Sequence, residues 1–184
     1  FTGGTGVLNI GHNHPKILET RIKFQQNKRM EVHKIVFSPY MAALCKNLSD
    51  VLPGDLKKTF ICNSGAEAIE GALKLAFKSY NGKRNHVLHS DISYHGRLIA
   101  SGSISGAEDY EKNFQKIPYT HSFIYNDFDS LYEKVDKLRD NNGKSLIYSI
   151  VIETFCAGRI IGCSEEFILK LGNLCKKEDI VLIV

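Results

Sequence analysis

The sequence predicts an α/β protein with a three-layer α/β/α architecture around a mostly parallel sheet. Short apolar runs alternate along the chain with patterns of apolar residues at helical spacing. Several of the runs are apolar at nearly every position, as in strands that are buried on both faces. The helical patterns between them are roughly ten to fifteen residues long, which suits the helices that connect parallel strands in βαβ units.

The first forty residues differ from the rest, because they begin with the glycine-rich, turn-prone sequence FTGGTGVLNIGHNHP. A helix is expected to begin at Pro15, since proline is favoured at the first helical position. We therefore expect two parts in the chain. Residues 1–35 form an N-terminal arm that lies across another body such as a partner subunit, and residues 36–184 form the first part of a large α/β domain.

The elements of the larger part follow from local patterns. Strands are expected at 58–62, 86–89, 145–153 and 180–184, and helices at 66–80, 129–140 and 164–177. The helix at 66–80 has apolar residues at i, i+3, i+4 and i+7 spacing. It closes with Asn81-Gly82, as 129–140 does with Asn142-Gly143. The strand at 145–153, SLIYSIVIE, is strongly β-branched, whereas the Ser/Gly-rich residues 90–106 predict a loop.

Composition excludes several classes of protein. The 184 residues are 43% hydrophobic and 24% charged, with a net charge of +4 and no block of like charges. Neither nucleic acid nor an anionic membrane surface is therefore an expected partner, and no apolar stretch approaches the roughly 20 residues of a membrane span. Five widely spaced cysteines without a C-x-x-C pair argue against a disulfide framework or a structural zinc, and indicate reduced thiols in the cytoplasm.

The turn Asn63-Ser64-Gly65 lies between an apolar run and the most regular helical pattern of the chain. Ser64 can cap that helix, and Glu67, three residues later, can complete a capping box. A second interpretation is a phosphate site, because Gly65 lets an anion approach the backbone and the amides of Gly65 and Ala66 lie at the positive end of the helix. Both functions can share the turn, which is neither a Walker loop nor a dinucleotide fingerprint.

Two further clusters follow expected strands. In Ser93-Tyr94-His95-Gly96-Arg97, the Tyr94 ring can stack on a flat heteroaromatic ligand. Taken alone, however, the segment is better explained by a half-buried tyrosine and a hydrogen-bonded histidine. Glu153 ends an apolar strand, either as a solvated strand end or as a carboxylate at the edge where ligands of parallel sheets bind. No metal is expected, because His12, His14, His86 and His89 have no further convergent ligand.

At this point the residues resemble a family. The segments CNSGAEAIEGALKLA, SYHGR and IVIE…LCKKEDIVLIV, in this order, resemble the class III pyridoxal-phosphate-dependent aminotransferases of PLP fold type I. The N-terminal GVLNIGHNHPKILE resembles the Gly-His-x-His-Pro segment of the same family. The likeness extends over almost the whole chain, and four ordered blocks are much more specific than any one of them.

The resemblance implies a role for each cluster. Ser64, Gly65 and Ala66 would hold the phosphate of pyridoxal 5'-phosphate, and Tyr94 would stack on its pyridine ring. His95 and Gly96 match the motif beside that tyrosine and would shape the loop. The resemblance likewise matches Glu153 to the acid that ends the equivalent strand near the cofactor. Residues 36–184 would then be the first part of the cofactor-binding large domain of a cytoplasmic homodimer.

The resemblance also has departures. The family usually has proline after that glutamate, whereas Thr154 follows here and leads to Arg159, so the substrate side of the pocket is unsettled. The segment with Phe37 and Ser38 resembles a region that lines substrate pockets in the family, but hydrophobic packing explains it equally well. The aspartate that pairs with the pyridine nitrogen and the Schiff-base lysine are expected beyond Val184, so residues 1–184 alone are expected to be inactive.

The activity implied is transfer of an amino group between an amine or amino acid and a 2-oxo acid. The same scaffold also supports aminomutase and phospho-lyase chemistry, and a non-catalytic binding or assembly fragment remains an alternative from another class. The residues do not identify the amino donor or acceptor.

Overall fold

A computed structural model describes residues 6–29, 36–106 and 115–184. The chain forms two compact units, Phe1–Ile61 and Cys62–Val184. Parts of the expected arm, residues 1–5 and 30–35, lie outside the described residues. The domain boundary expected after residue 35 stays a prediction.

The first unit contains two helices among its described residues, α1 (Pro15–Gln26) and α2 (Pro39–Val51). As predicted, α1 begins at Pro15, and α2 also begins with a proline, after the N-cap residue Ser38. The Ser38 hydroxyl accepts a hydrogen bond from the Met41 amide at 3.4 Å. Neither helix contains a buried residue, and apolar side chains such as Ile17 on α1 and Leu44 on α2 are exposed.

The second unit contains a four-stranded sheet formed by β1 (His86–Ser90), β2 (Thr120–Phe123), β3 (Ile147–Val151) and β6 (Val181–Ile183). The strand order is β2-β1-β3-β6, and every pair is parallel. Because parallel strands point the same way, their carboxyl ends lie along one edge of the sheet. The polar residues that follow the strands therefore gather at that edge.

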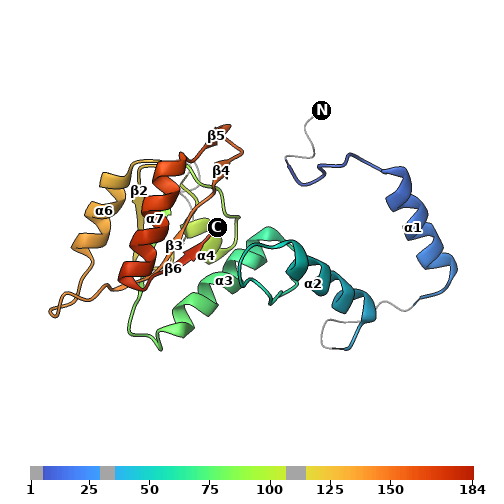
Figure 1. Ribbon diagram of the computed structural model, residues 1–184, viewed down its shortest axis with the longest axis horizontal. Coiled ribbons are helices and arrows are strands. Elements are labelled where there is room, and N and C mark those ends of the chain that lie inside the picture. Colours follow the sequence, from blue (N-terminus) through green and yellow to red (C-terminus); the bar gives the residue numbers. More distant parts are fainter. Residues whose placement is uncertain (1–5, 30–35, 107–114) are drawn as a thin grey trace. The chain divides into compact units, whose positions relative to one another are not determined.

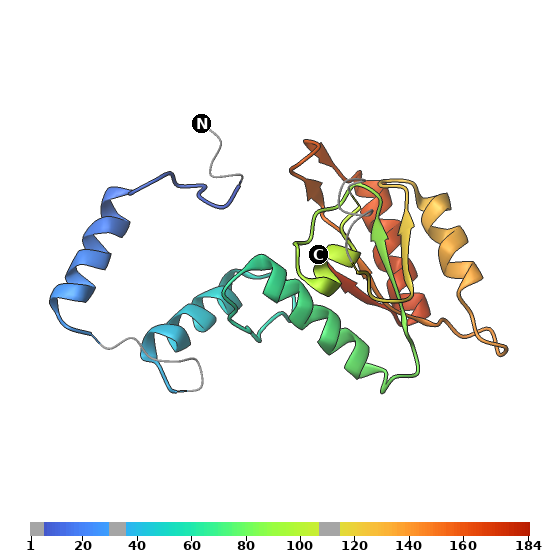
Figure 2. The same ribbon diagram turned by 180° about the vertical axis from the view of Figure 1, so that it is seen from behind.

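Helices cover both faces of this sheet (Figures 1 and 2). One face packs against α6 (Phe128–Lys137) and α7 (Glu165–Glu178), where the fully buried Leu131 and Leu171 join the core around Leu88. The other face packs against α3 (Gly65–Ser79), whose Leu73 joins the core around Val87. The predicted three-layer α/β/α architecture with a parallel sheet is confirmed.

Caps and burial explain why these helices form where they do. The Asp127 carboxylate accepts from the Ser130 amide at 3.0 Å, and the Ser164 hydroxyl accepts from the Phe167 amide at 3.2 Å. Each fully buried leucine, such as Leu131, contributes roughly 1.5–3 kcal/mol through the hydrophobic effect. Across the described residues, no helix combines the length and apolarity needed to cross a bilayer.

Most predicted elements of the second unit are present, but the strand predicted at 58–62 is wrong, because the sheet does not include this segment. A strand requires a hydrogen-bonded neighbour, which local propensity does not reveal. The helix predicted at 129–140 ends at Lys137, before Asn142-Gly143. Gly143 instead lies in the turn that allows Arg139 to bridge to Ser145.

Four short elements were not predicted. Residues 90–106 contain the helix α4 (Ile99–Ser103), whose first amides, those of Ala100 and Ser101, donate to the Glu70 carboxylate at 2.9 and 2.8 Å. This cap comes from a distant helix, so the local sequence gave no sign of it. The strand β2 has the polar sequence THSF, and β4 (Phe155–Cys156) and β5 (Ile161–Gly162) form a hairpin of only two residues each.

Candidate active site

The turn before α3 has the capping geometry that its sequence predicts, with one difference. The Ser64 hydroxyl accepts from the Glu67 amide at 3.2 Å. The Glu67 carboxylate reaches back one residue further than in a standard capping box, because it accepts from the Asn63 amide at 3.0 Å. Two amides at the start of α3 are thereby satisfied, and the turn is fixed by side chains of its own segment.

The amides of Gly65 and Ala66 belong to the first turn of α3, where no intrahelical acceptor exists. A side-chain carbon added at Gly65 would meet no atom within 4 Å, so the space beside the α-carbon of Gly65 is open. The fifteen-residue helix behind them contributes a positive partial charge at this end. The turn can therefore hold an oxyanion without disturbing the cap that Ser64 provides.

The loop that follows β1 lies directly against this turn. A side-chain carbon added at Gly96 would lie 2.6 Å from Cβ of Ala66 and 3.0 Å from the Ser101 hydroxyl oxygen. Gly96 also has φ of +126°, a conformation that other residues rarely adopt. Glycine at this position lets the loop and the start of α3 approach more closely than any other residue would permit.

The same loop is attached to the end of β3. The Tyr94 amide donates to the Glu153 carboxylate at 2.7 Å, although the two residues are 59 positions apart. The Tyr94 side chain is 49% exposed, and Glu153 is half-buried. The three clusters that the sequence singles out are thus brought together at one edge of the sheet. The segment 93–97 contacts the turn before α3 through Gly96, and it contacts Glu153 through the Tyr94 amide.

His95 is buried beside Tyr94, with 8% of its surface exposed. Its amide donates to the Ser105 hydroxyl at 2.9 Å, which fixes the loop to the residues after α4. The imidazole Nε2 has no hydrogen-bond partner in the described part of the chain. Burial, with a smaller effect from His89, lowers the pKa of His95 to about 4, so the ring is neutral at neutral pH.

Several residues that support the site were missed by sequence reasoning. The Ser105 hydroxyl accepts from the His95 amide in the loop, and the Glu70 carboxylate accepts from the Ser101 amide at the start of α4. Tyr125 follows β2 and donates its hydroxyl hydrogen to the Glu153 carbonyl oxygen at 3.0 Å. A signal for Tyr125 was available in principle, since it follows a strand end, but β2 itself was too polar to be recognised.

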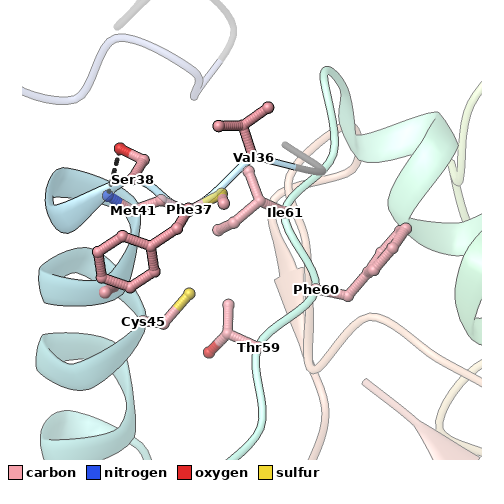
Figure 3. A pocket seen from close by; sticks show the side chains of 9 residues that line it. Val36, Phe37, Ser38, Met41, Cys45, Thr59, Phe60 and Ile61 are labelled. Atoms are coloured by element: carbon pink, nitrogen blue, oxygen red, sulfur yellow. Dashed lines mark hydrogen bonds between the residues drawn. The ribbon is translucent and has the colours of Figure 1, made fainter. Parts of the chain in front are cut away.

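The two residues noted before α2 line a hollow of about 480 Å³ in the first unit. Figure 3 shows side chains from the start of α2, such as Met41 and Cys45, facing Thr59 and Ile61 across it. Phe37 is 82% exposed, and Ser38 serves as the N-cap of α2. A role for Phe37 and Ser38 in substrate binding therefore stays a prediction. Arg159 is exposed in the turn between β4 and β5, with its role equally open.

Other ligand chemistries have less support. In the part of the chain that the structure describes, no three His, Cys, Asp or Glu side chains gather as metal ligands. The five cysteines are free thiols. Burial raises the pKa of Cys175 to about 12, so this thiol is protonated at neutral pH. The arrangement brings backbone amides at the start of a helix, an aromatic ring and a carboxylate together at one edge of the sheet.

Comparison with solved structures places this fold among the transaminases. A transaminase from the marine bacterium Virgibacillus aligns with a TM-score of 0.82 at 18% identity, over 94% of this chain and 41% of that one. The ornithine aminotransferase of Toxoplasma gondii aligns with a TM-score of 0.81 at 21% identity, over 99% of this chain and 43% of that one. These likenesses concern the fold.

Sequence comparison identifies the family. Residues 1–184 match the family described as Aminotransferase class-III, and the chain belongs to this family. The acetylornithine aminotransferase of Aquifex aeolicus is 32% identical over 190 residues, which are 100% of this chain and 48% of that protein. The succinylornithine transaminase of Photorhabdus laumondii is 29% identical, over 100% of this chain and 45% of that protein. The chain thus spans about half the length of these relatives.

Proposed function

We propose that this chain is part of an enzyme that transfers an amino group between an amine or amino acid and a 2-oxo acid, with pyridoxal 5'-phosphate as its cofactor. The observation that carries the proposal is the convergence of three separate motifs at one edge of the sheet. Gly96 lies against Ala66, and the Tyr94 amide donates to Glu153. Membership of a family that depends on this cofactor supports the same conclusion.

The residues present fit the phosphate end of the cofactor. The space beside the α-carbon of Gly65 is open, and the amides of Gly65 and Ala66 have no acceptor within α3. Ser64 keeps its hydroxyl on the Glu67 amide, so its contribution is to fix the turn and to present the hydroxyl at its rim. In this proposal the phosphate lies on the two amides, where the dipole of α3 stabilises its negative charge.

The other residues fit the ring end. The Tyr94 side chain is 49% exposed at the edge of the site, and in this proposal its ring stacks on the pyridine ring. Glu153 fixes the backbone of Tyr94 with one carboxylate oxygen. His95 and Gly96 shape the loop, His95 through its amide and Gly96 through its close approach to α3.

The bound cofactor supplies an electron sink for bonds at the carbon that carries the amino group. The chain's own residues then bind and orient. The first turn of α3 fixes the phosphate, Tyr94 sets the plane of the ring, and Glu153 holds the loop that carries Tyr94. His95 stays neutral beside the site, so it adds no positive charge that would draw the phosphate away from the amides of α3.

The relatives guide the choice of substrate. Two of them are named for acetylornithine and succinylornithine, which are ornithines with one amino group acylated. We therefore propose an ornithine-type amino donor and a 2-oxo acid as acceptor. Aminomutase and phospho-lyase chemistry, or a non-catalytic role, have no observation in their favour among the described residues.

We also propose that the enzyme is a cytoplasmic homodimer in which the arm packs on the partner subunit. In the first unit α1 exposes Ile17, Leu18 and Ile22, each more than 40% accessible. A helix with exposed apolar residues and none buried within its own chain is a candidate for burial against another chain.

The test uses the natural polypeptide in full, incubated with pyridoxal 5'-phosphate. We expect a visible absorbance band that borohydride treatment abolishes together with activity. Assays that pair ornithine, acetylornithine and other amines with 2-oxoglutarate or pyruvate should give an amino acid from the 2-oxo acid. A protein that binds the cofactor but releases ammonia or phosphate, or only isomerises an amine, would contradict the transfer reaction.

A further inference from the structure

Tyr125 is a buried tyrosine with 9% of its surface exposed, placed two residues after the end of β2 at the carboxyl edge of the sheet. Its hydroxyl oxygen lies 3.0 Å from the Glu153 carbonyl oxygen. The carbonyl oxygens of Thr154 and Ile161 lie at 3.4 and 3.3 Å. A phenol has one hydrogen to donate, so the shortest contact, to Glu153, takes the main share of it.

The backbone of Tyr125 is fixed as well. Its amide donates to the Asp91 carboxylate at 2.9 Å, and the Asp91 amide donates to the Phe123 carbonyl oxygen at 2.9 Å. Asp91 follows β1 and Tyr125 follows β2, so these bonds fasten the ends of two neighbouring strands to each other. The backbone from which the Tyr125 side chain extends is therefore held in place. The side chain has little freedom to move away from Glu153.

Glu153 connects Tyr125 to the loop that contains Tyr94, because it is hydrogen-bonded to both residues. Its carbonyl oxygen accepts from the Tyr125 hydroxyl and, at 3.6 Å, from the Cys163 thiol. Its carboxylate accepts from the Tyr94 amide at 2.7 Å. We call the sequence of contacts from Tyr125 through Glu153 to the Tyr94 amide the tyrosine relay.

The protonation of Tyr125 suits this geometry. Burial raises the pKa of Tyr125, and the nearby Cys163 thiol raises it further, so the phenol keeps its hydrogen across the neutral range. Three carbonyl oxygens surround the hydroxyl, and each of them would repel a phenolate. The hydroxyl thus acts as a permanent donor in this site.

We propose that Tyr125 is a positioning residue for the cofactor ring, which acts through Glu153 on the placement of Tyr94. The inference rests on the proposed function, because Tyr94 is the residue proposed to stack on the ring. It concerns ring placement alone, since no contact of the relay reaches the Gly65 and Ala66 amides proposed for the phosphate.

The first test measures the relay without any cofactor. In the natural polypeptide in full, residue-resolved hydrogen exchange at the Tyr94 amide is compared among wild type, Tyr125→Phe, Glu153→Ala and the double variant. We expect Tyr125→Phe to accelerate exchange about threefold to tenfold, and Glu153→Ala to accelerate it more. Because Tyr125 acts through Glu153, the double variant should exchange no faster than Glu153→Ala alone.

The matched control is Tyr132→Phe, which removes the same hydroxyl from an exposed tyrosine on α6. This variant should keep the wild-type exchange rate at Tyr94. A rate in Tyr125→Phe equal to that of the control would overturn the inference, and so would a double variant in which the two effects multiply.

The second test adds pyridoxal 5'-phosphate and records the visible circular dichroism of the bound cofactor, which reports ring orientation. Tyr125→Phe should change this signal and weaken cofactor binding severalfold, while the affinity for inorganic phosphate stays as in wild type. Unchanged dichroism in a variant that binds the cofactor would overturn the inference and leave the proposed function standing. Absence of cofactor binding by the wild type would instead refute the proposed function, and with it the role of Tyr125 toward the ring.

Discussion

A side-chain carbon at Gly96 would lie 2.6 Å from Cβ of Ala66, so the loop after β1 and the first turn of α3 are in direct contact. This contact joins the residues proposed to hold the cofactor ring to those proposed to hold its phosphate. It depends on one glycine, whose φ of +126° also disfavours any other residue.

Gly96→Ala is expected to destabilise the protein by about 2–4 kcal/mol, because the new methyl group would lie 2.6 Å from Cβ and 3.0 Å from Cα of Ala66, which the helix holds in place. It should also weaken cofactor binding, since the loop must move away from α3. Chemical denaturation and cofactor titration measure the two effects. The matched control is Gly102→Ala, where the nearest atom would lie at 3.8 Å. Equal stability in the two variants would refute the contact.

Ser64→Asp separates the capping role of the turn from its proposed phosphate site. Aspartate caps helices about as well as serine, so stability should change by less than about 0.5 kcal/mol. An added negative charge beside the phosphate should weaken pyridoxal 5'-phosphate binding by about tenfold or more. Ser64→Ala should show the opposite pattern: it should lower the free energy of unfolding by about 1 kcal/mol and affect cofactor binding less than Ser64→Asp does. If Ser64→Asp binds the cofactor as tightly as wild type, the phosphate site at this turn is refuted and only the capping role of Ser64 remains.

His95 predicts a specific dependence of stability on pH. Its pKa falls from 6.5 to about 4 on folding, so the unfolded chain takes up the proton first as the pH is lowered. The stabilisation from the neutral ring is therefore complete above pH 6.5 and is lost as the pH falls toward 4. A shift of this size corresponds to about 3 kcal/mol.

The measurement is urea unfolding of wild type and His95→Gln at several values between pH 7.5 and pH 4. At each pH the free energy of unfolding of wild type is compared with that of His95→Gln. The stability difference between them should shrink by up to about 3 kcal/mol across this range. His12→Gln, at an exposed position, should run parallel to wild type. A His95→Gln curve that also runs parallel to wild type would show that the ring is not held neutral by burial.

The ion pair of Arg139 and Glu178 gives a second prediction about pH, far from the site. The guanidinium bonds both carboxylate oxygens, at 2.8 and 3.0 Å, and holds the pKa of Glu178 below its usual range. Glu178→Gln should lose about 1–2 kcal/mol at pH 7. Because the carboxyl pKa of Glu178 is lower in the folded protein than its usual value of 4.5, the carboxylate contributes its full stabilisation above pH 4.5. The stability difference should shrink as the pH falls below 4.5 and should vanish below the lowered pKa.

The exposed pair of Glu166 and Lys170 on α7 is the comparison for this ion pair. Glu166→Gln should leave the stability within experimental error, because water and salt screen a pair on the surface. If both substitutions behave alike at pH 7, the partly buried pair contributes no more than an exposed one.

The sequence predicted those parts of the fold that local patterns encode. The helix α3 has a clear apolar face and a capping serine, and β3 is an unbroken β-branched run, so both were found nearly at their bounds. The strand β2 was missed because its four residues are mostly polar and gain their place by pairing with β1. The helix α4 was missed because Glu70, about thirty residues away, caps it.

The site followed the same rule. Ser64, Gly65 and Tyr94 belong to motifs that stand out in a single segment, and the resemblance to a family gave them roles. What the sequence did not reveal is how the segments touch. The contact of Gly96 with Ala66, the bond from Tyr94 to Glu153 and the placement of Tyr125 arise from tertiary packing.

The central claim is that the amides at the start of α3 hold the cofactor phosphate. A crystal structure of the natural polypeptide in full, grown with pyridoxal 5'-phosphate, tests it most directly. We expect phosphate oxygens within about 3.2 Å of the amide nitrogens of Gly65 and Ala66. A phosphate bound elsewhere in the protein, with these two amides facing water, would contradict the account.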